Sequence, residues 1–351
     1  MKKEQSQRIS ELDALRGIAA LLVVFYHFTM GQPEARFGFK FGITGVDLFF
    51  IISGFVILLT LEKTKHWKDF ILSRFSRIYP TYWACVTLTA ILVYWTTHPG
   101  IKLFLGSYMS NMTMFQSYFG FTDIDGPYWT MIVEMLFYLF MLGVFITGQL
   151  KHIERIGIIL LVPVFCYGYF LQASAPALQH FLDHRIPLIN HFPLFVAGLL
   201  FYKIRFDKPS LLRYAGIVIC FLVQLTLFRI GGRSNGVISF QEYTFVLSAY
   251  FLFFILYVNG ALGFIVNRIT LFLGRISYGL YLSHQYLALT ILIPFLVAKT
   301  SLSHWQAAFF IVLPVELGLA ALIHYVVEKP AMEKIRNWYK KRKEMLAVKS
   351  S

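Results

Sequence analysis

Long apolar stretches alternate with short polar segments along almost the whole of the 351-residue chain. A membrane-spanning helix needs about 20 predominantly apolar residues, within a range of roughly 17–25. Ten apolar stretches are candidate spans. The fifth and sixth are shorter than this range and could be tilted, kinked or partly re-entrant. The ten stretches cover approximately residues 14–30, 45–61, 78–96, 128–148, 156–171, 190–203, 214–230, 242–263, 271–298 and 305–327. The pattern predicts an all-α integral membrane protein, a bundle of about ten transmembrane helices, with a long loop and an interfacial piece over 97–127.

The composition supports a membrane protein and excludes a soluble one. Only 14% of the residues are charged and 57% are hydrophobic, whereas soluble domains average about 25% charged residues. The net charge of +14 would suggest a nucleic-acid partner in a soluble protein. Here the basic residues lie in short segments between apolar stretches, so we expect the lipid bilayer and no nucleic acid as a partner. The three cysteines, Cys85, Cys166 and Cys220, lie in apolar runs without metal-ligand spacing, and we expect no metal site.

The basic residues also predict the orientation of the helices. Lysine and arginine concentrate in cytoplasmic loops. With the N-terminus inside, the cytoplasmic segments hold 25 of the 32 basic residues. The seven in the outer segments are Arg36, Lys40, Lys102, Arg185, Arg229, Arg233 and Lys299. We therefore expect both termini in the cytoplasm and one transmembrane domain over 1–351. Its helical core would cover about 12–328, followed by a short basic tail over 329–351 and no appended soluble domain.

Several ionisable residues fall inside predicted membrane helices, where a charge is costly and often marks function. Arg16 and His27 lie eleven residues apart in the first helix, about 16 Å along its axis. Asp47, Glu134 and His284 are expected at a depth similar to that of His27. Each also has a structural interpretation, such as a hydrogen bond between helices or a solvated acid at a helix start. Position alone does not separate an enzyme from a proton-coupled transporter.

Seven segments, in order, carry a resemblance to a known family. They are Leu12–Gly17 followed by His27, Gly45–Phe55, Arg74–Pro80, Trp129–Tyr138, Phe195–Tyr202, Ile276–His284 and Tyr325–Pro330. The first has an arginine, ten residues and a histidine, the third has the form Arg-x-x-Arg-Ile-x-Pro, and the fourth the form Trp…Glu…Phe-Tyr. The chain thus resembles the membrane acyltransferase 3 family from about residue 10 to 331. It departs from the common pattern at Ala14, where the family commonly has glycine.

The resemblance implies an enzyme that moves an acyl group, often acetyl, from cytoplasmic acyl-CoA to a hydroxyl of an extracytoplasmic carbohydrate or lipid-linked glycan. It implies no tightly bound cofactor, with acetyl-CoA or another acyl-CoA as co-substrate, and a multi-pass place in the cell (inner/cytoplasmic) membrane. Some members carry an appended extracytoplasmic hydrolase-like domain, and this sequence ends about twenty residues after its last predicted helix. A separate extracytoplasmic transferase is therefore an expected partner if the family needs one to pass the acyl group on.

The candidate catalytic residues are His27, Glu134 and Asp47. An imidazole with its usual pKa of about 6.5 can accept the proton of the attacking hydroxyl. It could instead carry the acyl group covalently. Glu134 or Asp47 would orient the ring and stabilise its protonated form, as a carboxylate does in a serine-protease triad.

The candidate donor-binding residues are Arg74, Arg77 and Arg16. Arg74 and Arg77 lie three residues apart, on one face if the segment is helical. Guanidinium groups suit the phosphates of coenzyme A better than ammonium groups do. Trp129 and His284 are the candidate acceptor-binding residues, with the indole as a flat face for a sugar ring. The other classes left open are a proton-coupled transporter or flippase of a small acid or lipid-linked sugar, and a non-catalytic membrane scaffold.

Overall fold

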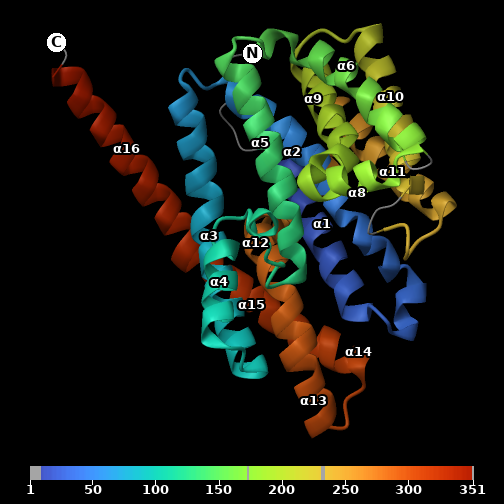
Figure 1. Cartoon of the computed structure of the whole chain (residues 1–351), viewed down its shortest axis with the longest axis vertical. Coiled ribbons are helices and arrows are strands. Elements are labelled where there is room, and N and C mark those ends of the chain that lie inside the picture. Colours follow the sequence, from blue (N-terminus) through green and yellow to red (C-terminus); the bar gives the residue numbers. More distant parts are fainter. Residues whose placement is uncertain (1–8, 172–173, 231–233, 350–351) are drawn as a thin grey trace. The chain divides into compact units, whose positions relative to one another are not determined.

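The computed structural model describes residues 9–171, 174–230 and 234–349, and within them every regular element is helical (Figure 1). Short 3₁₀ and π-helical turns join or extend several helices. The helices are α1 (Ser10–Thr29), α2 (Gly45–Glu62), α3 (Trp67–Thr97), α4 (Ile101–Asn111), α5 (Trp129–Ile146), α6 (Ile153–Cys166), α8 (Pro176–Arg185), α9 (Phe192–Phe206), α10 (Leu211–Ile230), α11 (Phe240–Val258), α12 (Arg268–Tyr286), α13 (Ile293–Lys299), α14 (His304–Gln306), α15 (Leu313–Ile323) and α16 (Lys329–Lys349).

The all-α membrane fold predicted from the sequence is confirmed. Nine helical stretches in the described part of the chain are long and apolar enough to cross a membrane. They correspond to nine of the ten predicted spans. The sixth, predicted over 190–203, forms α9, whose 15 residues extend only about 22 Å. Four of the basic residues used to predict the orientation, Lys2, Lys3, Arg8 and Arg233, lie outside the described residues, and the orientation itself stays a prediction.

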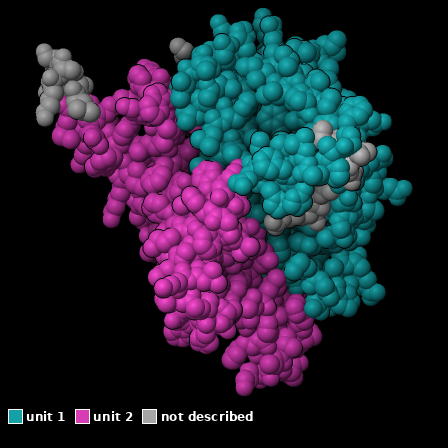
Figure 2. Space-filling view, viewed as in Figure 1, with its two compact units in different colours: residues 1–63, 129–277 teal, residues 64–128, 278–351 magenta. Residues whose placement is uncertain are grey.

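The chain divides into two compact units (Figure 2). Unit 1 consists of residues 1–63 and 129–277, and unit 2 of residues 64–128 and 278–351. Each unit therefore combines segments that are distant in the sequence. The expectation of one transmembrane domain stays a prediction, and the two units are described separately below.

In unit 1, α2 and α9 pack so closely that their glycines face the partner's backbone. A Cβ atom on Gly54 would overlap the carbonyl of Phe195, and one on Gly198 would overlap the carbonyl of Ile51. The two helices run in the same direction, because His191 contacts Asp47 where both begin. Lys203 likewise contacts Glu62 where both end. Although α9 is short, it therefore follows α2 through most of its depth, as the alternation of the predicted spans requires. The ring of Phe195 also stacks on Phe137 of α5, with centroids 4.1 Å apart.

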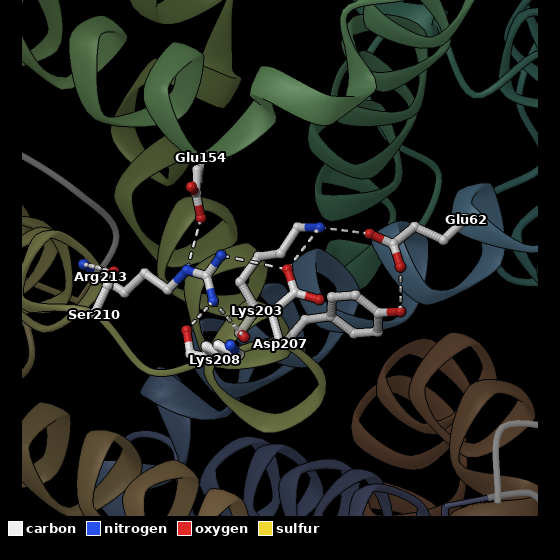
Figure 3. A network of polar contacts seen from close by, with 8 residues as sticks. Glu62, Glu154, Lys203, Asp207, Lys208, Ser210 and Arg213 are labelled. Carbon is white, nitrogen blue, oxygen red and sulfur yellow. Dashed lines mark hydrogen bonds and ion pairs between the residues drawn. The ribbon is translucent and has the colours of Figure 1, made fainter. Parts of the chain in front are cut away.

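A network of charged groups ties four helices of unit 1 together where α2 and α9 end (Figure 3). Glu62 accepts hydrogen bonds from the Tyr202 hydroxyl at 2.7 Å and from Lys203 Nζ at 2.6 Å. Arg213 of α10 donates to Glu154 of α6 at 2.8 Å. Asp207 joins the two halves, because it lies 3.2 Å from Lys203 Nζ and 3.3 Å from Arg213. The network therefore links α2, α6, α9 and α10 to one another at one end of unit 1.

In unit 2, three segments form more helix than the sequence suggested. Helix α3 begins at Trp67, eleven residues before the predicted span, and so includes Arg74 and Arg77. The expected loop over 97–127 contains α4. The expected basic tail over 329–351 forms α16, which lies antiparallel along α3. Arg336 Nε donates to Ser76 Oγ at 3.4 Å, and Lys343 Nζ lies 3.1 Å from Asp69 Oδ2.

Candidate functional site

Asp47 is the centre of a polar cluster at the start of α2 in unit 1. Its side chain is only 5% exposed. The Tyr243 hydroxyl of α11 donates a hydrogen bond to Oδ2 at 2.9 Å. His191, directly before α9, places its Nδ1 3.8 Å from Oδ1. The buried carboxylate thus joins the starts of three helices, α2, α9 and α11.

Aromatic rings enclose His191 and bring Trp129 into the same cluster. The His191 ring centroid lies 4.8 Å from that of Phe50 and 5.5 Å from that of Trp129, the first residue of α5. Asp47 and Trp129, which the sequence placed separately, are therefore linked through a histidine that the sequence analysis did not select. An imidazole beside a carboxylate and an indole can bind a hydroxyl-bearing ring and hold one of its hydroxyl groups.

Glu134 lies farther along α5 than Trp129, and it contacts α2 beyond Asp47. Ser53 Oγ of α2 donates to Glu134 Oε1 at 2.6 Å, and the Tyr138 hydroxyl donates to the same oxygen. Ser53 is six residues beyond Asp47, which is about 9 Å along the axis. Glu134 is five residues beyond Trp129. Trp129 lies in the cluster around Asp47, and Glu134 contacts Ser53 farther along α2. Helices α2 and α5 therefore run in the same direction, and Asp47 and Glu134 lie at different depths along them.

His27 lies in the last turn of α1, and Arg16 lies near its beginning. Gly45 of α2 packs directly against Ala19 and Val23 of α1. Because the two helices are antiparallel, His27 lies toward the connecting loop, roughly 10 Å from Asp47 along the axes. The partners described above for Asp47 are His191 and Tyr243, rather than the His27 imidazole that the sequence analysis assigned to it.

The two candidate residues of α1, His27 and Arg16, have partners within their own helix. His27 Nδ1 lies 2.9 Å from the carbonyl oxygen of Val23, to which it donates. A neutral ring that donates from Nδ1 carries its lone pair on Nε2, the form that a general base requires. Arg16 lies 3.5 Å from the Asp13 carboxylate, three residues earlier. The structure therefore gives Arg16 an acidic partner within its own helix.

The two predicted donor-binding arginines, Arg74 and Arg77, are half-buried on α3 in unit 2. The helical conformation confirms the condition under which the two side chains share a face. Arg336 of α16 lies close enough to Arg77 for the two positive charges to repel each other. Three guanidinium groups thus gather along one part of α3, and the third was not selected from the sequence.

His284, the second predicted acceptor-binding residue, is completely buried in unit 2. Its Nδ1 lies 3.0 and 2.9 Å from the carbonyl oxygens of Leu280 and Tyr281 in its own helix. These contacts lie within α12 and fit a structural role for the side chain. A role in acceptor binding stays a prediction.

A further buried carboxylate, Asp125, precedes the predicted membrane segment that contains α5. It accepts hydrogen bonds from the backbone N–H groups of Gly126 at 2.7 Å and Tyr286 at 3.2 Å. Burial raises the pKa of Asp125 to about 7, and the nearby Asp123 also raises it. This side chain therefore titrates near neutral pH while it holds the loop to the helix that carries His284.

Comparison with known proteins identifies the family. A family model described as an acyltransferase domain matches residues 9–325. The chain belongs to this acyltransferase family. It is therefore a multi-pass membrane acyltransferase, and the resemblance inferred from the seven segments is confirmed. No solved structure matches this acyltransferase significantly.

Three relatives illustrate the range of similar proteins. A protein of Acidianus two-tailed virus whose name describes it as an acetyltransferase, ORF330, is 25% identical over 295 residues, 81% of this chain and 84% of the relative. The O-acetyl transferase of Shigella phage Sf6 is 31% identical over 43% of this chain and 49% of its own length. The peptidoglycan O-acetyltransferase OatA of Listeria monocytogenes serovar 1/2a is 30% identical over 37% of this acyltransferase and 23% of the relative.

Proposed function

We propose that this acyltransferase moves an acetyl group from cytoplasmic acyl-CoA to a hydroxyl of an extracytoplasmic carbohydrate or lipid-linked glycan. The family membership and the O-acetyl transfer named for the relatives support the acyl chemistry. The peptidoglycan named for the Listeria relative supports a carbohydrate acceptor. The proposal places the protein in the cell membrane and leaves room for a separate extracytoplasmic transferase that receives the acyl group.

The observation that carries the proposal is the cluster of Asp47, His191 and Trp129, which lies roughly 10 Å along the helix axes from His27. We assign His27 the role of general base, because its Nδ1 contact leaves Nε2 as the basic nitrogen. Trp129 would stack on the acceptor ring, and the Asp47–His191 pair would hold an acceptor hydroxyl. Glu134, fixed by Ser53 and Tyr138, would support α5 behind this surface.

The proposed reaction balances with these groups alone. The acceptor hydroxyl loses its proton to His27 Nε2 as its oxygen attacks the thioester carbonyl. The carbon–sulfur bond then breaks, and coenzyme A leaves as a thiolate that takes up the proton from His27, which restores the neutral imidazole. Arg74 and Arg77 would hold the phosphates of the donor, with Arg16 as a further candidate for its pantetheine arm.

The test is acyl transfer by the purified protein in lipid nanodiscs, with isotope-labelled acetyl-CoA and a soluble peptidoglycan fragment or oligosaccharide as acceptor. We expect release of free coenzyme A that depends on the acceptor, together with label in the product. The His27→Ala variant, prepared identically, is the control for background thioester hydrolysis. Equal rates of release in wild type and control, or no release with any acceptor, would contradict the proposal and favour the transporter alternative.

A further inference from the structure

Helices α3 and α16 of unit 2 form a basic groove that the proposed reaction has not used. It is lined by Asp69, Ser73, Arg336, Tyr339, Lys340 and Lys343, and its volume is about 300 Å³. We call it the α3–α16 groove. Ligand sites in proteins have volumes of roughly 300–1,000 Å³. The groove is therefore large enough for one end of a molecule such as coenzyme A and too small for all of it.

The charges in the α3–α16 groove are arranged to receive an anion. Its single carboxylate, Asp69, is already engaged, because Lys343 Nζ lies 3.1 and 3.3 Å from its two oxygens and Tyr339 also donates to it. The remaining cations are Arg336 and Lys340. Arg336 is additionally opposed by the charge of Arg77. A bound phosphate would relieve this repulsion and satisfy both cations, and charge-assisted contacts of this kind are the strong ones.

The position of the groove along α3 determines which part of a donor it can hold. Ser73 lines the groove, and Arg74 and Arg77 follow it within the next turn. Arg336 donates to Ser76 Oγ at 3.4 Å, so that α16 is fixed to α3 at this point. The groove therefore lies directly beside the two arginines assigned to donor phosphates, on the side toward the beginning of α3. A donor whose diphosphate contacts Arg74 and Arg77 would place its terminal nucleotide there.

We infer that the α3–α16 groove binds the phosphorylated adenosine end of the acyl-CoA donor, with Arg336 and Lys340 on its 3′-phosphate. Tyr339 lies in the same groove, where its ring can contact the adenine. The inference rests on the proposed function, because it requires coenzyme A as the donor. A phosphate of an anionic lipid headgroup has the same chemistry, and the experiment has to distinguish the two sources.

The experiment compares the binding of coenzyme A and of 3′-dephospho-coenzyme A to the full-length protein in phosphatidylcholine nanodiscs, which offer no anionic lipid. We expect the wild type to bind coenzyme A at least about tenfold more tightly, which corresponds to about 1.4 kcal/mol. Arg336→Gln should lose most of this preference for the 3′-phosphate, because only Lys340 then remains to hold it. Arg342→Gln is the matched control, because it removes the same charge from the same helix. Its side chain lies over the Trp338 ring at 5.4 Å instead of lining the groove.

Each outcome decides between the alternatives. Equal binding of the two ligands to the wild type would overturn the inference and leave the proposed donor intact, whereas binding of neither would overturn both. A loss of the same size in Arg336→Gln and Arg342→Gln would reduce the effect to general electrostatics and also overturn it. A second set of nanodiscs containing phosphatidylglycerol tests the lipid source. Loss of phosphatidylglycerol binding in Arg336→Gln, with no preference for the 3′-phosphate in the wild type, would assign the groove to a lipid headgroup.

Discussion

The contact between Asp47 and His191 allows the base of the proposed reaction to be identified by a quantitative prediction. At the observed separation of 3.8 Å, the attraction between a carboxylate and an imidazolium is about 4 kcal/mol for an effective dielectric constant of about 20. Each 1.36 kcal/mol corresponds to about tenfold in rate. If His191 accepted the proton in the transition state, Asp47→Asn would therefore lower the rate by about 10³.

We expect a smaller effect, because we assign the proton to His27. In that case Asp47→Asn weakens only the positioning of His191 and of the acceptor, a loss of about tenfold, comparable with one neutral hydrogen bond. The asparagine side chain keeps an oxygen that can accept from the Tyr243 hydroxyl, so the packing is preserved. His27→Ala should lower the rate by about 10²–10⁴, the usual cost of losing a general base.

The assay is the initial rate of acetyl transfer by purified variants in nanodiscs, with thermal unfolding of each variant as the control for folding. The double variant of Asp47→Asn and His191→Ala should be only slightly slower than His191→Ala alone, because the two residues act as one unit. The assignment would be refuted if Asp47→Asn lost about 10³ while His27→Ala kept more than a tenth of wild-type activity. The base would then be His191.

Four further predictions test other parts of the molecule. Gly198→Ala should destabilise the protein by about 3 kcal/mol through overpacking against α2. Gly143→Ala is the control and should not, because the space around its Cβ is open. Thermal unfolding in detergent measures both variants. Arg77→Ala should weaken coenzyme A binding at unchanged protein levels. Lysine at this position should restore binding only in part, because it lacks the bidentate fork. Equal affinities of the wild type and Arg77→Ala in a titration with coenzyme A would contradict this prediction. The folded protein keeps the Asp125 proton up to about pH 7, whereas an unfolded chain releases it near pH 4. The stability of the fold should therefore decrease as the pH rises from about 4 to about 7. Asp125→Asn should remove this part of the pH dependence of the unfolding temperature. A reporter fused after Ser351 should be active only in the cytoplasm, and activity outside would overturn the charge-based orientation.

The helices of this protein could be predicted from the sequence because their signal is local. A run of about 20 apolar residues is sufficient to indicate a span, and the polar segments between runs indicate where it ends. The signal weakened where a helix was short or polar. Helix α9 has only 15 residues, and its place beside α2 depends on the interlocking of Gly54 with Gly198. Helix α16 is charged and was expected as a tail, although its residues pack along α3.

The candidate site was harder to predict, because its contacts join residues that are far apart in the sequence. Asp47 was selected as a carboxylate inside a span, and Trp129 and Glu134 as parts of a motif. His191 was missed because it directly precedes a helix, where a histidine resembles an ordinary loop residue. Only the parallel packing of α2 and α9 brings it to Asp47 across 144 positions, a distance along the chain that no local pattern encodes. The antiparallel packing of α1 and α2 separates Asp47 from His27 by roughly 10 Å along the axes. The rates of the Asp47 and His27 variants therefore test this arrangement of helices as directly as they test the chemistry.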